Sequence, residues 1–149
     1  MKKNFLSFFV FFSCFPLVAS AVLYEGPEAK ACFTEHAEPR QQEKCLQQKK
    51  KQSELKMENF IAETNKRIKA NNMGSFNGKN DSDETSGDVY SKRFLYAQNQ
   101  WKKYRERLCL AVATEINEDA YDYQSFIAQC EINLNKRHME EINMMGITP

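Results

Sequence analysis

The stretch from Phe94 to Val112 places the strongest constraint on how this chain folds. At about 100° per residue round a helix, its apolar side chains fall on one stripe and charged or amide side chains on the other. This pattern predicts an amphipathic helix laid on a core. Three residues of the stripe are unusual there: Gln98, Trp101 and Arg105. Because a buried guanidinium without partners is costly, we expect a defined hydrogen-bond network at Arg105, or a buried stem with its head group in water.

A second segment with helical periodicity precedes this one. It begins at Pro39, which suits a first helical turn, and ends near Ala70. Its apolar stripe consists of Leu46, Met57, Phe60, Ile61, Thr64 and Ile68. Lys50 falls on the same stripe, so residues 47–52 are expected to project beyond the core or to kink. Their lysines are expected to lie in solvent rather than to form a docking patch for an acidic partner.

The central helix is expected to begin with Asp88 as its N-cap and to end near Thr114, and Asp119 is expected to cap the last helix. The stripe of the last helix contains Tyr123, Phe126, Ile127, Cys130, Leu134 and Arg137. Arg137 is therefore expected on a core-facing surface, as a second cation with a buried stem. Residues 22–37 suggest an arm or one short helix. The three long helices, with one long and one short connection, predict an all-α, three-helix antiparallel bundle.

The long connection, residues 71–87, is rich in Asn, Gly, Ser and Asp and has hardly an apolar residue to bury. This composition predicts a mobile loop, and loops of this length are either functional or disordered. The acids of the loop do not match a calcium-binding loop. Counting from Asp81, the sixth position is Ser86 instead of Gly and the twelfth is Lys92 instead of Glu.

The first 21 residues have the pattern of a secretory signal peptide. Two lysines precede an apolar run from Phe5 to Val18, and the small residues that follow allow cleavage after Ala21. The alternative is a lipid anchor at Cys14, although the bulky aromatic residues before it make a poor lipidation signal. The run is too short and too interrupted for a stable membrane span. We therefore expect a periplasmic or secreted protein.

Residues 22–149 are expected to form a single helical domain. Cleavage removes two of the 21 basic residues and none of the 20 acidic ones, so the remaining chain is close to neutral. A chain near neutrality has no overall attraction for nucleic acid or for an anionic membrane.

Cleavage also leaves four cysteines, Cys32, Cys45, Cys109 and Cys130. In an oxidising compartment an even number indicates two disulfides, for which the sequence alone allows three connectivities. Cys109 and Cys130 lie on facing stripes of successive helices, which favours their pairing and leaves Cys32 for Cys45. A zinc site is the alternative, but there is no Cys-x-x-Cys, and His36 and His138 do not have ligand spacing. No metal or cofactor is expected.

The sequence contains no catalytic motif: no Gly-x-Ser-x-Gly, no His-Glu-x-x-His and no phosphate-binding Gly loop. The acids are scattered, and nothing singles out two of them as a glycosidase pair. We expect a protein that is not an enzyme. Gln98, Trp101 and Arg105 could line a binding cleft, but their stripe favours a structural role, with Trp101 as a core anchor.

The order Gln98, Trp101, Tyr104, Arg105 and Cys109, followed by Cys130 and Arg137, resembles the LprI-like family of small exported helical proteins. The resemblance extends from about Cys32 to Ile142 and is strongest from Gln98 onward. The family takes its name from a lysozyme inhibitor. The resemblance therefore implies an exported protein that binds lysozyme or another peptidoglycan hydrolase and has no catalytic residues of its own.

An inhibitor of such a hydrolase has to block an acidic catalytic cleft. Lys79, between Gly78 and Asn80 in the long loop, is a candidate partner-binding residue because it could present a cation to the catalytic carboxylates. Two alternatives share the same sequence features: an immunity-like protein that neutralises a delivered cell-wall toxin, and a structural envelope protein without inhibitory activity.

Overall fold

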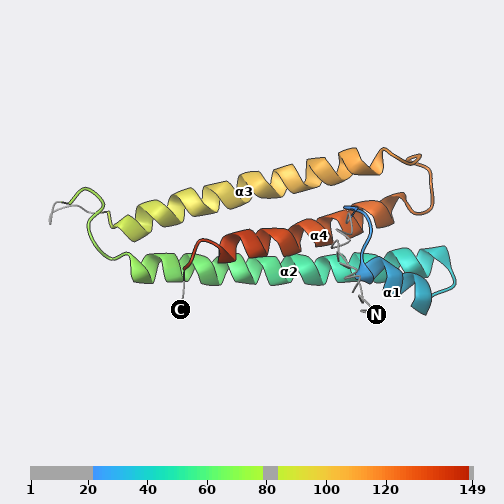
Figure 1. Ribbon diagram of the computed structural model, residues 1–149, viewed down its shortest axis with the longest axis horizontal. Coiled ribbons are helices and arrows are strands. Elements are labelled where there is room, and N and C mark those ends of the chain that lie inside the picture. The colour runs from blue at the N-terminus through green and yellow to red at the C-terminus, as the bar shows by residue number, and fades with distance from the viewer. Residues whose placement is uncertain (1–21, 79–83, 148–149) are drawn as a thin grey trace, which may run out of the picture.

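The computed structural model describes residues 22–78 and 84–147 (Figure 1). The signal peptide expected over residues 1–21, its cleavage after Ala21, the alternative anchor at Cys14 and the candidate Lys79 lie outside the described residues. None of the helices within the described ranges is long and apolar enough to cross a membrane.

The described chain folds into helices without strands. The helices are α1 (Pro27–Glu35), α2 (Pro39–Asn71), α3 (Ser86–Ala113) and α4 (Tyr123–Asn143). The all-α class is therefore confirmed, whereas three helices is wrong: α1 is a fourth. It begins at Pro27, which suits a first helical turn, and it buries Ala29 and Cys32 against α2 and α4. Its nine residues are too few for periodicity alone to separate it from an arm.

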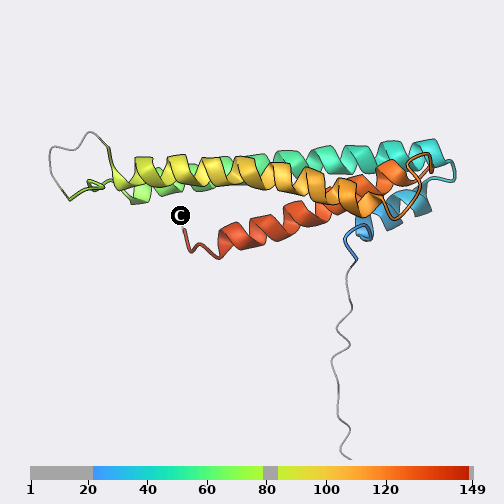
Figure 2. The same cartoon turned by 90° about the horizontal axis from the view of Figure 1, so that it is seen from above.

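Helices α2 and α3 form a long antiparallel hairpin, and α4 packs against both of them along part of the hairpin (Figures 1 and 2). At about 1.5 Å per residue, the 33 residues of α2 span about 50 Å and the 21 residues of α4 about 30 Å. The loop end of the hairpin therefore projects beyond α4. Helix α1 folds back along the start of α2.

The core consists of three apolar clusters along α4. One joins α1, α2 and α4 around Leu46 and Ile132, and a second joins α2, α3 and α4 around Met57, Phe94 and Ile142. The third joins α3 and α4 around the buried Cys109 and Cys130. Trp101 is half-buried and packs against the second and third clusters. It therefore anchors the core from one side and is not enclosed by it.

Two disulfides cross-link the helices in pairs. Cys32 in α1 is bonded to Cys45 in α2, and Cys109 in α3 to Cys130 in α4. This is the connectivity that the helical stripes favour. Cross-links of this kind typically stabilise a fold by about 2–4 kcal/mol, so each pair of helices is held together by more than packing.

Two predicted helix starts and one predicted interruption of a helix are wrong. Helix α3 begins at Ser86 with Thr85 as its N-cap. Asp88 is the third residue of the helix and forms a capping box with Thr85, in which the side chain of each residue accepts a hydrogen bond from the backbone N–H of the other. Helix α4 begins at Tyr123 with Asp122 at the cap position, so Asp119 belongs to the preceding turn. Helix α2 is continuous through residues 47–52 and neither kinks nor leaves the bundle there.

The described ends of the long loop are tied together at its base. Ser75 and Thr85 form an isolated antiparallel bridge, and the backbone N–H of Ser86 donates to the carbonyl of Gly74 at 2.7 Å. Gly87 lets α3 approach the end of α2 closely, because a Cβ there would lie 2.9 Å from the carbonyl oxygens of Lys69 and Asn72. The connection is therefore shorter than residues 71–87, and its base is ordered.

Candidate functional site

Arg105 lies in a buried polar network between α2, α3 and α4. Its side chain is 5% exposed, and Nη1 donates a 2.7 Å hydrogen bond to Oδ1 of Asn135. Its Nη2 lies 3.8 Å from Oε2 of Glu131 and 3.7 Å from Oε1 of Glu54. The network expected at Arg105 is therefore present, and the alternative of a head group in water is wrong.

Lys50 belongs to the same network. Its Nζ lies 2.9 Å from Oε2 of Glu131, a carboxylate that is 4% exposed. The expectation that this lysine is solvated is therefore wrong, because a buried carboxylate on α4 lies opposite it. Its position on the apolar stripe of α2 was the signal that could have identified this pair. An apolar stripe that contains one cation needs an acid on the facing helix.

A second polar cluster lies next to the network, around His138 of α4. Its Nε2 is 2.6 Å from Oε1 of Gln98, and its Nδ1 is 2.9 Å from a carboxylate oxygen of Glu141. Trp101 stacks on the imidazole with ring centroids 3.8 Å apart and planes 6° apart. Burial lowers the pKa of His138 below its ordinary value and outweighs the opposing effect of Glu141.

These two clusters bring Gln98, Trp101 and Arg105 together around α4, but not as an open cleft. Gln98 and Arg105 are buried and bonded to α4, and the Arg105 guanidinium lies 5.8 Å from the centre of the Trp101 ring. The arrangement sets the positions of α3 and α4 and leaves these groups little contact with a ligand. It is the structural role that the stripe favours.

The other two residues of the sequence motif lie elsewhere. Tyr104 is 55% exposed on the outer side of α3. Arg137 is exposed and does not lie on a core-facing surface, so that expectation is wrong. Cys130 faces α3 through its disulfide. Arg137 lies seven residues later, on about the same side of the helix, and is exposed. Figure 2 shows the C-terminal part of α4 diverging from α3.

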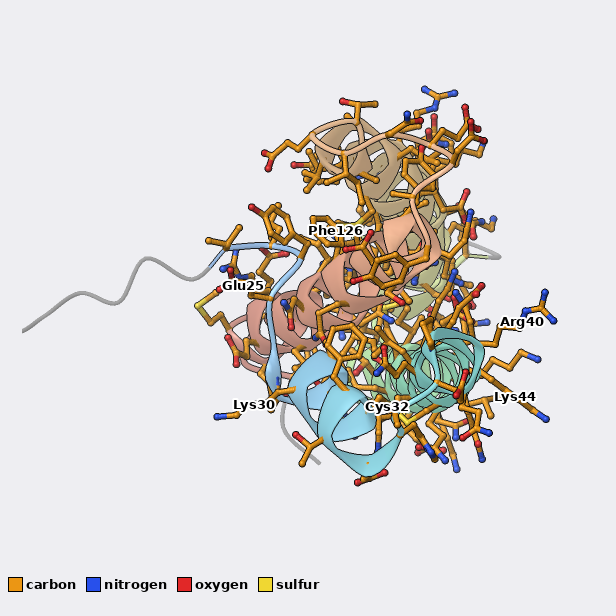
Figure 3. All side chains as sticks on the ribbon, turned by 90° about the vertical axis from the view of Figure 1, so that its right-hand side faces the viewer. Glu25, Lys30, Cys32, Arg40, Lys44 and Phe126 are labelled. Atoms are coloured by element: carbon orange, nitrogen blue, oxygen red, sulfur yellow. A yellow bond between two sulfur atoms is a disulfide. The ribbon has the colours of Figure 1, made fainter. Side chains whose placement is uncertain are left out.

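Arg137 lines a surface groove between the N-terminal arm and α4. The groove has a volume of about 1100 Å³. Its apolar wall includes Tyr24, stacked on Phe126 at 4.4 Å, and Phe33. Figure 3 shows the arm passing Phe126 on its way to α1. Both acids and cations line the groove: Glu25, Lys30, Lys136, Arg137 and Glu140.

Amide side chains of α4 hold this arm in place. Gln129 accepts from the backbone N–H of Ala29 at 2.7 Å, and Asn133 donates to the carbonyls of Leu23 and Glu25. One turn further, Lys136 pairs with Glu28 at 2.6 Å. Burial alone would raise the pKa of Glu28, but hydrogen bonds from Lys136 and Gln129 hold it below its ordinary value.

Sequence reasoning missed these side chains of α4, which together act as a clamp on the arm. Gln129, Asn133 and Lys136 are spaced by four and three residues on α4. That spacing places them on one face of a helix, so a polar row there was a usable signal for a segment docked by its backbone.

The described residues hold no free thiol for nucleophilic or metal chemistry. Glu35, His36 and Cys45 have ligand atoms within 4.8 Å of one another. Because Cys45 is bonded to Cys32, its sulfur is not a thiolate, the form that binds metals. The buried carboxylates of the network are paired with Lys50 and Arg105. The arrangement is that of a cross-linked scaffold.

Comparison with known proteins agrees with this description. A family model described as Lysozyme inhibitor LprI matches residues 32–142, from the first disulfide cysteine to the last turn of α4. No curated protein and no solved structure shows significant similarity to the chain. Because the matched residues include both disulfides and the buried network, the chain belongs to the LprI family.

Proposed function

We propose that the protein is an exported binding protein that inhibits a lysozyme or a related peptidoglycan hydrolase by protein–protein contact. The observation that carries this proposal is the match of residues 32–142 to the LprI lysozyme inhibitor model. Because that range covers α2, α3, the last turn of α1, nearly all of α4 and both disulfides, the proposal concerns the scaffold and not a short motif.

The disulfides support the exported part of the proposal. Disulfides form and persist in oxidising compartments such as the periplasm or the cell exterior. All four cysteines after residue 21 are paired, and the N-terminal sequence has the pattern of a signal peptide. Mass spectrometry of the exported protein tests this directly. The expected product begins at Val22 and has lost two hydrogens for each disulfide, whereas a lipid adduct on Cys14 would contradict the soluble form.

The architecture supports action by contact. Helices cross-linked in pairs form a scaffold whose surface changes little on binding, and such preorganisation reduces the entropy lost on association. In the interior, Arg105 is bonded to Asn135, His138 is bonded to Gln98, and Lys50 is paired with Glu131. A protein of this kind acts through its surface.

Inhibition is measured by titrating the purified protein, without residues 1–21, against hen egg-white lysozyme and a bacterial muramidase. The readout is the rate of lysis of a cell-wall suspension. We expect the rate to fall to near zero as the inhibitor reaches molar excess. Unchanged lysis by both enzymes at that excess would contradict the proposed function.

Lys79 remains the candidate residue of the loop for this function. If the loop enters the cleft, the Lys79 ammonium group pairs with the catalytic carboxylates of the hydrolase and Lys79→Ala weakens inhibition by about tenfold, whereas contact through another face leaves inhibition unchanged. Lys66→Ala is the matched control, because Lys66 is exposed on α2 and forms no ion pair with another described residue. An unchanged inhibition constant for Lys79→Ala would end the loop mechanism and leave the inhibitor proposal standing.

A further inference from the structure

The outer side of α3 is a long exposed face without an acidic residue. At 100° per residue, it carries Arg93, Tyr96, Gln100, Lys103, Tyr104 and Arg107. The two acids of α3 lie on other sides: Asp88 belongs to the capping box, and Glu106 pairs with Arg105. Figure 1 shows α3 along one edge of the molecule, and all six residues are exposed.

The cations of this face are available to a partner. Lys92 and Lys102, on the flanks of α3, already pair with Glu84 and Glu58. By contrast, Lys103 and Arg107 form no ion pair within residues 22–78 and 84–147. Because both are exposed, their charges act on whatever approaches α3.

Two tyrosines accompany these cations. Tyr96 is 68% exposed and Tyr104 is 55% exposed, so neither contributes much to the core. Tyr104, Lys103 and Arg107, together with Gln100 and Leu108, line a shallow hollow of about 450 Å³. Tyrosine and arginine are enriched among the residues that dominate binding energy at protein interfaces. The residue types are therefore those of a docking surface.

The outer side of α2 is also basic, but it lacks these features. Its exposed cations include Lys44, Lys51 and Lys66, a residue type that is depleted at interfaces, and Arg40 at its start is its one exposed arginine. No aromatic residue stands among them, and the exposed Leu55 is its one large apolar side chain. Charge alone therefore does not distinguish the two faces, whereas composition favours α3. This makes α2 a matched control.

We infer that the outer face of α3 docks on the acid-lined substrate cleft of the peptidoglycan hydrolase, with Lys103 and Arg107 facing its carboxylates and Tyr104 packed beside them. The inference rests on the proposed function. Glycosidases of this class use two carboxyl groups, about 5–9 Å apart depending on mechanism. Residues four apart on a helix have Cβ atoms about 5–6 Å apart. Two flexible cations with that spacing can pair with such carboxylates.

The test compares two charge reversals of equal size. Lys103→Glu/Arg107→Glu changes the α3 face, and Lys44→Glu/Lys51→Glu changes α2 by the same net charge. All four residues are solvent-facing, so thermal unfolding should match the native protein in both variants. We expect the dissociation constant for the hydrolase, measured by surface plasmon resonance, to rise about 100-fold in the α3 variant and less than about threefold in the control. Tyr104→Ala should raise it about tenfold.

Ionic strength gives an independent readout. The association rate constant of the native protein should fall as salt rises, because screening weakens charge steering. The α3 variant should lose this dependence and the control should keep it. Equal effects of the two double variants would overturn the docking face while leaving the inhibitor proposal intact. Absence of binding by the native protein would overturn both. If the native protein binds purified peptidoglycan and only the α3 variant loses that binding, the proposed docking on the hydrolase is also overturned, because the α3 face would then bind the glycan.

Discussion

Glu131 is the residue whose replacement tests the buried network most directly. Its carboxylate is 4% exposed and lies 2.9 Å from Lys50 and 3.8 Å from Arg105. At an effective dielectric constant of about 20, these distances correspond to about 6 and 4 kcal/mol of attraction. Desolvation of the three charges offsets much of this sum. Removing the acid alone leaves Lys50 without its closest carboxylate and Arg105 without one of its three, and the break of a buried pair typically costs about 3–5 kcal/mol.

We therefore expect Glu131→Gln to lower the free energy of unfolding by about 3–5 kcal/mol at pH 7. Lys50→Met should cost only about 1–2 kcal/mol, because the methionine keeps the buried stem and Glu131 still faces Arg105. The measurement is urea-induced unfolding with the disulfides intact, followed by circular dichroism. The double variant completes a cycle in which the two costs should not add. A loss below about 1 kcal/mol for Glu131→Gln would show that the network is not what positions α2 and α4.

Three further predictions concern other parts of the fold. Because burial lowers the pKa of His138, the unfolded chain takes up a proton near pH 6.5, before the folded protein does. The free energy of unfolding should therefore be complete above pH 6.5 and fall as the pH drops below it. It should fall less in His138→Gln, and urea titrations at pH 7.5 and 5.5 measure both. Replacing Cys109 and Cys130 together by Ala removes a cross-link between residues 21 positions apart, and the midpoint of thermal unfolding should fall by an amount equivalent to about 3 kcal/mol; an unchanged midpoint would contradict this role. Gly26→Ala would place a Cβ 2.3 Å from Nε2 of Gln129, so the arm should detach. The backbone N–H of Ala29, which donates to Gln129, should then lose its protection from hydrogen exchange, while the amides of α3 and α4 keep theirs.

The long helices were predictable because their periodicity records which side is buried. The stripe of α3 placed Gln98, Arg105 and Cys109 inward, and all three are buried in the structure. The stripe of α2 likewise contained Leu46 and Ile68, which are both fully buried. Arg105 could also be assigned to a network, because a buried guanidinium needs partners wherever the fold supplies them.

The remaining errors share one physical origin, which is that periodicity describes one helix at a time. The sequence of α2 alone does not show that Glu131 of another helix lies opposite Lys50. The divergence of α4 from α3, which exposes Arg137, depends on packing along the whole bundle. The clamp formed by Gln129 and Asn133 bonds backbone groups of residues 23–29, so the side chains of the arm do not indicate where it docks. Long-range partners set these positions.

The placement of the two disulfides divides the molecule into halves. One bond joins α1 to α2, the other joins α3 to α4, and neither crosses the connection that follows Gly78. A single backbone cut between Gly78 and Glu84 would therefore yield two fragments, each internally cross-linked and free of any covalent tie to the other. They would be held together only by the non-covalent packing of α2 against α3 and α4 and of α1 against α4, so their reassembly would depend on concentration. The chain could thus be split there into a pair of complementing halves.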